Sequence, residues 1–101
     1  MNRNKVLGTL GLARRARKMV LGETAVWEAL RNSQAKWVLL ASDTGKNTTK
    51  RIVDKTHFYH VTLTQTFSTE ELSRAIGLEN TKVIALTDSA FAELLSHAID
   101  E

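Results

Sequence analysis

The sequence predicts an α/β fold, and three observations lead to that class. The chain has 101 residues, enough for one domain with its own core and too few for two, and 43% of them are hydrophobic. Short apolar segments alternate with longer segments in which apolar residues recur every three or four positions, as in strands that alternate with helices. Residues 37–41 are continuously apolar, which is typical of a central strand covered on both faces. Strands joined by helical connections predict a largely parallel sheet with helices on both faces.

The first half of the chain predicts two helices and two strands. Val6, Leu10 and Ala13 recur at helical spacing and share one face of the first helix. Gly8 and Gly11 interrupt that helix, and we attribute them to close packing against a neighbouring helix. The predicted elements are a helix at 3–16, a strand at 19–21, a helix at 24–31 and a strand at 37–41.

The second half predicts three helices and two strands. Ser68 begins a capping box, Gly77 is expected to stop the same helix, and Asp88 is expected to cap the last helix. Val53 and Leu94 are expected to face the core as part of the apolar faces of their helices. The predicted elements are a helix at 47–59, a strand at 61–63, a helix from 68 that stops at 77, a strand at 82–86 and a helix at 90–99.

Three segments of the chain follow the ends of predicted strands. They are residues 22–25, 42–50 and 86–91. Ligands of parallel sheets gather at such ends, where helix N-termini converge, so we expect the three segments to form a single functional edge. The backbone amides and small polar side chains of that edge suit contacts to phosphates and sugars better than catalysis.

Charge is unevenly distributed along the chain. The formal net charge is only +3, but residues 1–18 carry +6 and residues 68–101 carry −5. Four of the cations cluster at the end of the first predicted helix: Arg14, Arg15, Arg17 and Lys18. Capping of the helix dipole is one interpretation of this cluster, and binding of a polyanion is the other. The cluster holds more cations than capping requires, which favours a polyanionic partner on this side of the molecule.

The composition excludes several kinds of site. Because the chain has no cysteine, it has no disulfide, no thiolate metal site and no cysteine nucleophile. Its longest apolar run is too short to cross a bilayer, and Arg14 and Arg15 stand where a signal peptide has small residues, so we expect a mature, cytoplasmic protein with no membrane partner. Neither His57 nor His60 has a partner at metal-ligand spacing, and motifs for a nucleophile or a phosphate loop are absent. We expect no metal, no cofactor and no enzymatic activity.

Several stretches of the chain also resemble a known family. Residues 22–43 resemble the central stretch of the L7Ae/L30e ribosomal proteins. Residues 72–77 are similar to a characteristic helix of that family, and residues 83–92 are similar to its last strand, loop and helix. Residues 10–18 and 43–50 are most similar to its bacterial YlxQ-type branch. The similarity runs in order over nearly the whole chain, which is therefore identified as a member of this family.

The resemblance implies both a fold and an activity. The implied fold is a three-layer α/β/α sandwich with a small mixed four-stranded sheet, in which residues 1–101 form a single RNA-binding domain. The implied activity is non-catalytic binding of structured RNA, typically a kink-turn, in which a bulge between two helices bends the backbone sharply. Such a protein stabilises the bent form because it binds that form more tightly. We expect a kink-turn-like RNA, ribosomal or other, as the partner, with the ribosome as one place of action and the protein as a monomer.

The residues expected to bind RNA come from the basic cluster and from the segments that match the family's binding surface. They are Arg14, Arg15, Arg17, Lys18, Gly22, Glu23, Thr24, Glu28, Lys46, Asn47, Lys50, Thr87, Asp88 and Ser89. The family's motif has Asn, Glu and Lys where this chain has Thr24, Ala25 and Glu28. Ala25 cannot accept a hydrogen bond from a guanine edge, and Glu28 places an anion where the family has a cation. These departures remove contacts of kink-turn recognition, whereas the cations retain contacts to any RNA backbone.

Two other classes of function remain open at the level of sequence. One is a protein-interaction adaptor that docks its partner through the acidic C-terminal third, residues 68–101. The other is an enzyme, or a detached substrate-binding domain similar to one that precedes some RNA methyltransferases. The chain carries no recognisable set of catalytic residues to support an enzyme.

Overall fold

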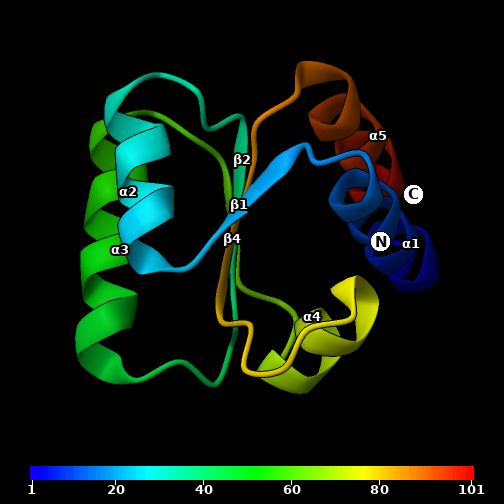
Figure 1. Ribbon diagram of the computed structural model, residues 1–101, viewed down its shortest axis with the longest axis horizontal. Coiled ribbons are helices and arrows are strands. Elements are labelled where there is room, and N and C mark those ends of the chain that lie inside the picture. Colours follow the sequence, from blue (N-terminus) through cyan, green and yellow to red (C-terminus); the bar gives the residue numbers. More distant parts are fainter.

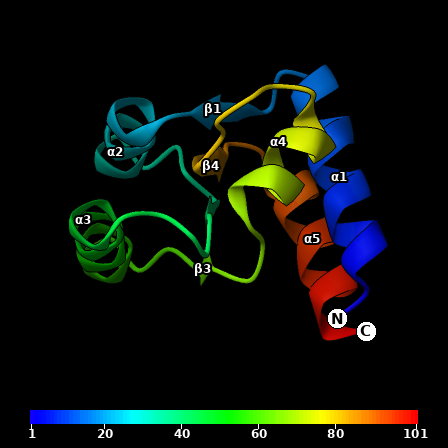
Figure 2. The same cartoon turned by 90° about the horizontal axis from the view of Figure 1, so that it is seen from below.

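The computed structural model describes residues 1–101 and places helices on both faces of one four-stranded sheet (Figure 1). In chain order, the elements are α1 Arg3–Arg15, β1 Met19–Leu21, α2 Glu23–Arg31, β2 Trp37–Leu40, α3 Lys46–Phe58, β3 Leu63–Thr64, α4 Thr69–Ile76, β4 Val83–Leu86 and α5 Ser89–Asp100. Helices α2 and α3 cover one face of the sheet, and α1, α4 and α5 cover the other (Figure 2). This arrangement confirms the predicted α/β class and the three-layer sandwich.

Local sequence signals set the ends of the last two helices. The Ser68 hydroxyl accepts from the N–H of Glu71 at 3.1 Å, and the Glu71 carboxylate accepts from the N–H of Ser68 at 3.0 Å, which confirms the capping box of α4. Gly77 ends this helix with a left-handed backbone, φ 76°. Asp88 caps α5 by accepting from the N–H of Ala90 at 2.8 Å. These boundaries agree with the predicted ones because caps depend on neighbours in the chain.

The third strand lies later in the chain than predicted. The prediction was residues 61–63, whereas the strand is Leu63–Thr64. The N–H of Val61 donates to the carbonyl of Thr56 at 3.0 Å, so Val61 still belongs to the C-terminal cap of α3. His60, just before it, has a left-handed backbone with φ 57°, as this type of helix end requires. The helix end therefore occupies Val61, the first residue that the apolar pattern assigned to the strand.

The sheet has the strand order β1-β4-β2-β3, and β4 runs antiparallel to both of its neighbours. Only β2 and β3 are parallel. The sheet is mixed, as the family resemblance implies, and the expectation of a largely parallel sheet is wrong. The reason is that α4, with eight residues, lies at the end of the sheet where β2 stops and does not carry the chain back to the other end (Figure 1). The N–H of Ala41 donates to the carbonyl of Lys82 at 2.7 Å, which holds the start of β4 beside the end of β2.

Two apolar cores lie on the two faces of the sheet. Alternate residues of a strand point to opposite faces. Leu39 and Ile84 therefore join the core under α1, α4 and α5, whereas Val38 and Ala85 join the core under α2 and α3. All of β4 and nearly all of β2 are buried, which confirms the prediction of a central strand covered on both faces.

Val53 and Leu94 do not face the core, so that expectation is wrong. Their side chains are 37% and 52% exposed. Helix α3 buries Ile52 and Thr56, one turn apart, and α5 buries Leu95. Both helices lie in outer layers of the sandwich, so only the side of each helix that faces the sheet is buried. Apolar residues at the margin of that side remain exposed.

Candidate nucleic-acid interface

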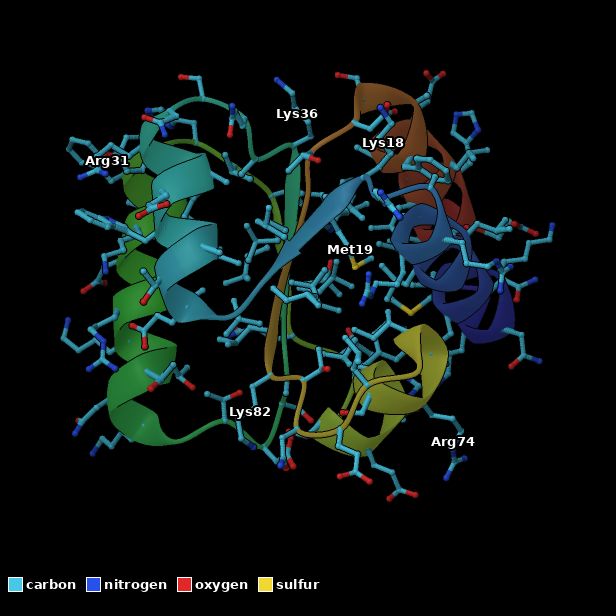
Figure 3. The ribbon with its side chains drawn as sticks, viewed as in Figure 1. Lys18, Met19, Arg31, Lys36, Arg74 and Lys82 are labelled. Atoms are coloured by element: carbon cyan, nitrogen blue, oxygen red, sulfur yellow. The ribbon has the colours of Figure 1, made fainter.

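The antiparallel β4 divides the predicted functional edge into two. The first edge, where β1 and β2 end and β4 begins, carries residues 22–25 and 42–50. The second edge lies where β4 ends and where β1 and β2 begin, and it carries residues 86–91. Figure 3 shows Lys18 and Lys36 at the second edge. The expectation of a single edge is wrong, because it assumed that all strands end on the same side.

The predicted RNA-binding residues accordingly fall into two groups. Those at or beside the first edge are Gly22, Glu23, Thr24, Lys46, Asn47 and Lys50. Those at or beside the second edge are Arg14, Arg15, Arg17, Lys18, Thr87, Asp88 and Ser89. The remaining residue, Glu28, lies within α2, is exposed and forms no ion pair.

Two helix N-termini lie at the first edge, and each begins at a glycine. Gly22 is the N-cap of α2 and Gly45 is the N-cap of α3, and neither helix has a side-chain cap. Gly22 has φ 89°, a backbone conformation that other residues rarely adopt. The N–H groups of both first turns are therefore not capped by a side chain. Such groups bind phosphate, assisted by the positive end of the helix dipole.

A loop that the sequence did not single out completes the first edge. Residues 78–82, which connect α4 to β4, border a hollow of about 540 Å³ whose other walls include Gly22, Glu23 and Thr48. Leu78 is 39% exposed, although it is a large apolar side chain. A second hollow, of about 730 Å³, shares the same loop and extends over α4. The sequence carried one signal for this loop, because Leu78 directly follows Gly77, the glycine that stops α4. Only the direction of β4, however, places the loop beside α2.

Two charged residues of the first edge, Glu23 and Lys50, form ion pairs. Arg51 donates two hydrogen bonds to Glu23, 2.6 Å from Nε to Oε2 and 3.0 Å from Nη2 to Oε1. The hydrogen bond from Arg51 lowers the pKa of the Glu23 carboxyl below its usual value. Lys50 Nζ lies 2.8 Å from Asp54 Oδ2, whereas Lys46 is exposed and forms no ion pair. Glu23 therefore opposes an approaching phosphate less than an unpaired carboxylate would.

Asp43 has a structural role at this edge. Its Oδ1 accepts from the N–H and from the hydroxyl of Thr69, both at 2.8 Å. The backbone hydrogen bond from Thr69 lowers the pKa of Asp43. Lys82 Nζ donates to the same hydroxyl at 3.0 Å. These contacts fix the loop after β2 against the start of α4.

Five cationic residues form what we call the second-edge cluster: Arg14, Arg15, Arg17, Lys18 and Lys36. One of them has an acidic partner, since Lys18 Nζ lies 3.8 Å from Asp88 Oδ2. The other carboxylate oxygen of Asp88 caps α5, which confirms its expected role as an N-cap. Ser89 is exposed beside it, and Thr87 is half-buried. The second edge is therefore more positive than the first.

The fold and these two edges define a small α/β binding domain whose exposed groups suit a phosphate-bearing ligand. No three histidine, aspartate or glutamate side chains are grouped as metal ligands, and no helix has both the length and the apolar character of a membrane span. The chain belongs to the ribosomal protein L7Ae/L30e/S12e/Gadd45 family, whose model matches residues 4–95.

Comparison with individual proteins agrees with this assignment. The chain is 45% identical over 91 residues to the RNA-binding protein YlxQ of Bacillus subtilis (strain 168), which covers 90% of this chain and 91% of the relative. It is 36% identical over 99 residues to the RNA-binding protein YlxQ of Enterococcus faecium, covering 98% and 95% of the two chains. A solved protein of unknown function from Bacillus halodurans C superposes with a TM-score of 0.90 at 39% identity, over 96% of this chain and 98% of that one. The Giardia lamblia 15.5kD RNA binding protein shares the fold, with a TM-score of 0.83 at 14% identity, over 96% and 83% of the chains.

Proposed function

We propose that residues 1–101 act as one domain that binds structured RNA, without catalysis, through the first edge. One observation supports this above the others: two glycine-led helix N-termini and the loop at 78–82 lie at the same edge of the sheet. Helix N-termini bind phosphates, and Leu78 offers an apolar surface for a sugar or an unstacked base. Membership of a ribosomal protein family, and relatives that are named RNA-binding proteins, favour RNA among phosphate-bearing ligands. The proposed contact residues are Gly22, Glu23, Thr24, Lys46, Asn47 and Lys50, together with Leu78 of the loop.

The RNA in this proposal is kink-turn-like, ribosomal or other. A bent RNA presents the backbones of two arms close together, and two helix N-termini on one edge can donate to both. A straight duplex offers a single continuous backbone to the same groups. Tighter binding to the bent form would shift the RNA towards it. We place this activity in the cytoplasm, on the ribosome or another ribonucleoprotein, and expect the protein to act as a monomer.

Three positions on α2 define how this edge would differ from the family's motif. Thr24 is exposed and keeps a hydroxyl that can donate or accept a hydrogen bond. Ala25 has no polar group, and Glu28 carries a negative charge. Contacts to phosphates therefore contribute more of the affinity than contacts to bases, and binding weakens steeply with salt.

The test is a titration of the protein into a labelled kink-turn RNA and into a straight duplex of matched length, at several salt concentrations. We expect the bent RNA to bind roughly tenfold more tightly at each salt concentration. Leu78→Asp should weaken kink-turn binding by about tenfold or more, because it puts a charge into the proposed contact. Leu94→Asp changes another exposed leucine, on α5, and is the control, which should leave the affinity within about twofold.

Two results would count against the proposal. Equal affinity for the bent and straight RNAs, with a steep salt dependence, would leave only general electrostatic binding and remove the kink-turn preference. Failure of both RNAs to bind near physiological salt would remove RNA binding itself.

The adaptor alternative has less support in the structure. Of the seven acidic residues in the C-terminal third, four form ion pairs within the molecule: Glu70, Glu71, Asp88 and Glu101. Two of the partners, Arg3 and Lys5, belong to α1. The acidic third therefore mainly offsets the basic N-terminal segment and presents no continuous negative face.

A further inference from the structure

The second-edge cluster carries more positive charge than the fold uses. Four of its five residues have no acidic partner, whereas two cations beside the first edge, Lys50 and Arg51, are ion-paired. Arg14 and Arg15 occupy the last turn of α1, where a cation complements the helix dipole. Arg17 and Lys18 lie beyond that turn, and Lys36 comes from a different segment. The dipole of α1 therefore does not account for the cluster.

Arg17 has a backbone conformation that favours glycine. Its φ is 59°, in the left-handed region. It lies just past the end of α1, where the N–H of Lys18 donates to the carbonyl of Ala13 at 2.9 Å. Helices that end in this way commonly have glycine at the position of Arg17, because glycine adopts the conformation at lower cost. Ser33 and His60 have the same conformation just past the ends of α2 and α3, so the helix end sets the backbone of Arg17, and its side chain is left exposed to solvent.

The sheet holds the cations of the cluster in a fixed arrangement. The N–H of Thr87 donates to the carbonyl of Lys18 at 2.9 Å, and the N–H of Lys36 donates to the carbonyl of Leu86 at 2.7 Å. The two lysines thus flank the end of β4 from its two neighbouring strands (Figure 3). Their backbones are about 10 Å apart, which is two strand spacings. Nε of Arg14 is shielded from solvent and has no hydrogen-bond partner within the protein.

We propose that the second-edge cluster binds the phosphate backbone of a second RNA segment, so that one molecule holds two RNA segments together. The inference rests on the proposed function, which assigns the first segment to the first edge. Guanidinium and ammonium groups bind phosphates without reading bases, so the second contact is independent of sequence. Of the exposed large apolar side chains, Leu12 and Leu94 border a hollow with Arg15, but none borders a hollow with Arg14, Arg17, Lys18 or Lys36. An acidic protein partner would need an apolar centre to its interface, so the cluster favours RNA.

The second segment must be distinct from the stretch of RNA at the first edge. The edges lie at opposite ends of β4, whose four residues span about 13 Å. Helices cover both faces of the sheet between the edges (Figure 2). A straight RNA helix that lies along one edge therefore does not reach the other.

The test compares two variants that each lose two positive charges. The second-edge variant is Arg17→Gly with Lys36→Gln, and the control is Arg3→Gln with Lys5→Gln, at the start of α1. The protein is held on a biotin-labelled kink-turn RNA, and recruitment of a fluorescent straight duplex is measured. We expect the second-edge variant to recruit roughly tenfold less duplex than the wild type, with the slope of log affinity against log salt smaller by about two. Both variants should bind the kink-turn within about twofold of the wild type, and Arg17→Gly should not lower the thermal midpoint.

The outcomes separate this inference from the proposed function. Equal recruitment by the two variants overturns the second surface, as does a wild type that binds the kink-turn and recruits no duplex. A wild type that does not bind the kink-turn overturns the proposed function, and the duplex is then titrated alone. In that titration, loss of duplex binding in the second-edge variant but not in the control still supports the second surface. Equal duplex affinities of the two variants overturn it.

Discussion

Glu23 and Glu28 are both acids on α2, yet their surroundings differ. Glu23 lies in the first turn, where the helix dipole favours an anion, and Arg51 neutralises it through two hydrogen bonds. Glu28 lies about 8 Å further along the helix and has no cationic partner. At the scale of single residues, Glu28 is therefore the uncompensated negative charge on the helix that leads from the first edge.

Replacing Glu28 with lysine tests whether α2 faces RNA phosphates. Glu28→Lys should raise the affinity for the kink-turn RNA by roughly tenfold at low salt and steepen the salt dependence by about one, because it adds a phosphate contact. Glu93→Lys on α5 makes the same charge change at an exposed, unpaired acid and serves as the control. Titration at two salt concentrations measures both effects. An affinity that rises equally in the two variants, or in neither, would place the RNA surface away from α2.

Gly8 and Gly11, in the same helix, have different environments. A Cβ added at Gly11 would come within 3.0 Å of the carbonyl oxygen of Ala75, so α1 and α4 approach too closely there for a side chain. A Cβ added at Gly8 would meet no atom within 4 Å. The attribution of both glycines to close helix packing is therefore confirmed for Gly11 and wrong for Gly8.

At the scale of elements, this contrast predicts opposite effects of one substitution. Gly8→Ala should raise the free energy of unfolding by about 0.5–1 kcal/mol, because alanine has the higher helix propensity and space is available. Gly11→Ala should lower it by about 1 kcal/mol or more, because the strain against α4 exceeds the same gain in propensity. Urea denaturation of the two variants and the wild type measures both. Stabilisation by both substitutions would mean that α1 and α4 can separate without loss.

The elements that the sequence predicts well are those defined by neighbours in the chain. The capping box at Ser68 and the stop at Gly77 depend on residues three or four positions apart, and the structure confirms them. The direction of β4 depends on where α4 lies against the rest of the molecule. No local pattern reports that placement, so the sequence alone favoured a parallel sheet.

At the scale of the whole molecule, the difference between local sequence patterns and long-range packing also explains which parts of the candidate site could be predicted. The glycine-led start of α2 was predicted because Gly22 directly follows an apolar strand. The loop at 78–82 was missed, and the segment at 86–91 was joined to the wrong edge, because both assignments follow from the direction of β4. Reversing one strand separates the basic cluster from the first edge, and this separation is what allows two distinct surfaces.

Three carboxylates link elements that are distant in the sequence, and each has a lowered pKa. The links are Glu23 to Arg51, Asp43 to Thr69 and Glu71 to Arg3. The pKa of Glu23 falls through its hydrogen bond with Arg51, that of Asp43 through the N–H of Thr69, and that of Glu71 through the N–H of Ser68 and then Arg3. The unfolded chain, whose carboxyls titrate at about pH 4, therefore binds protons at a higher pH than the folded chain does. The stability that these groups contribute is complete above that pH and is lost as pH falls through the lower, folded pKa values.

The fold should consequently lose stability in acid through these links in particular. We expect the thermal midpoint of the wild type to stay nearly constant from neutral pH to about pH 5 and to fall below about pH 4. One variant removes the three titrating links: Glu23→Gln, Asp43→Asn and Glu71→Gln. It should have a lower midpoint than the wild type at neutral pH and a flatter pH dependence, so that the two curves approach each other in acid. The control changes three exposed acids that form no ion pair: Glu79→Gln, Glu93→Gln and Asp100→Asn. It should keep the wild-type pH dependence, whereas an equally flattened curve would show that acid acts through total charge and not through the links between α1, α4, β2, α2 and α3.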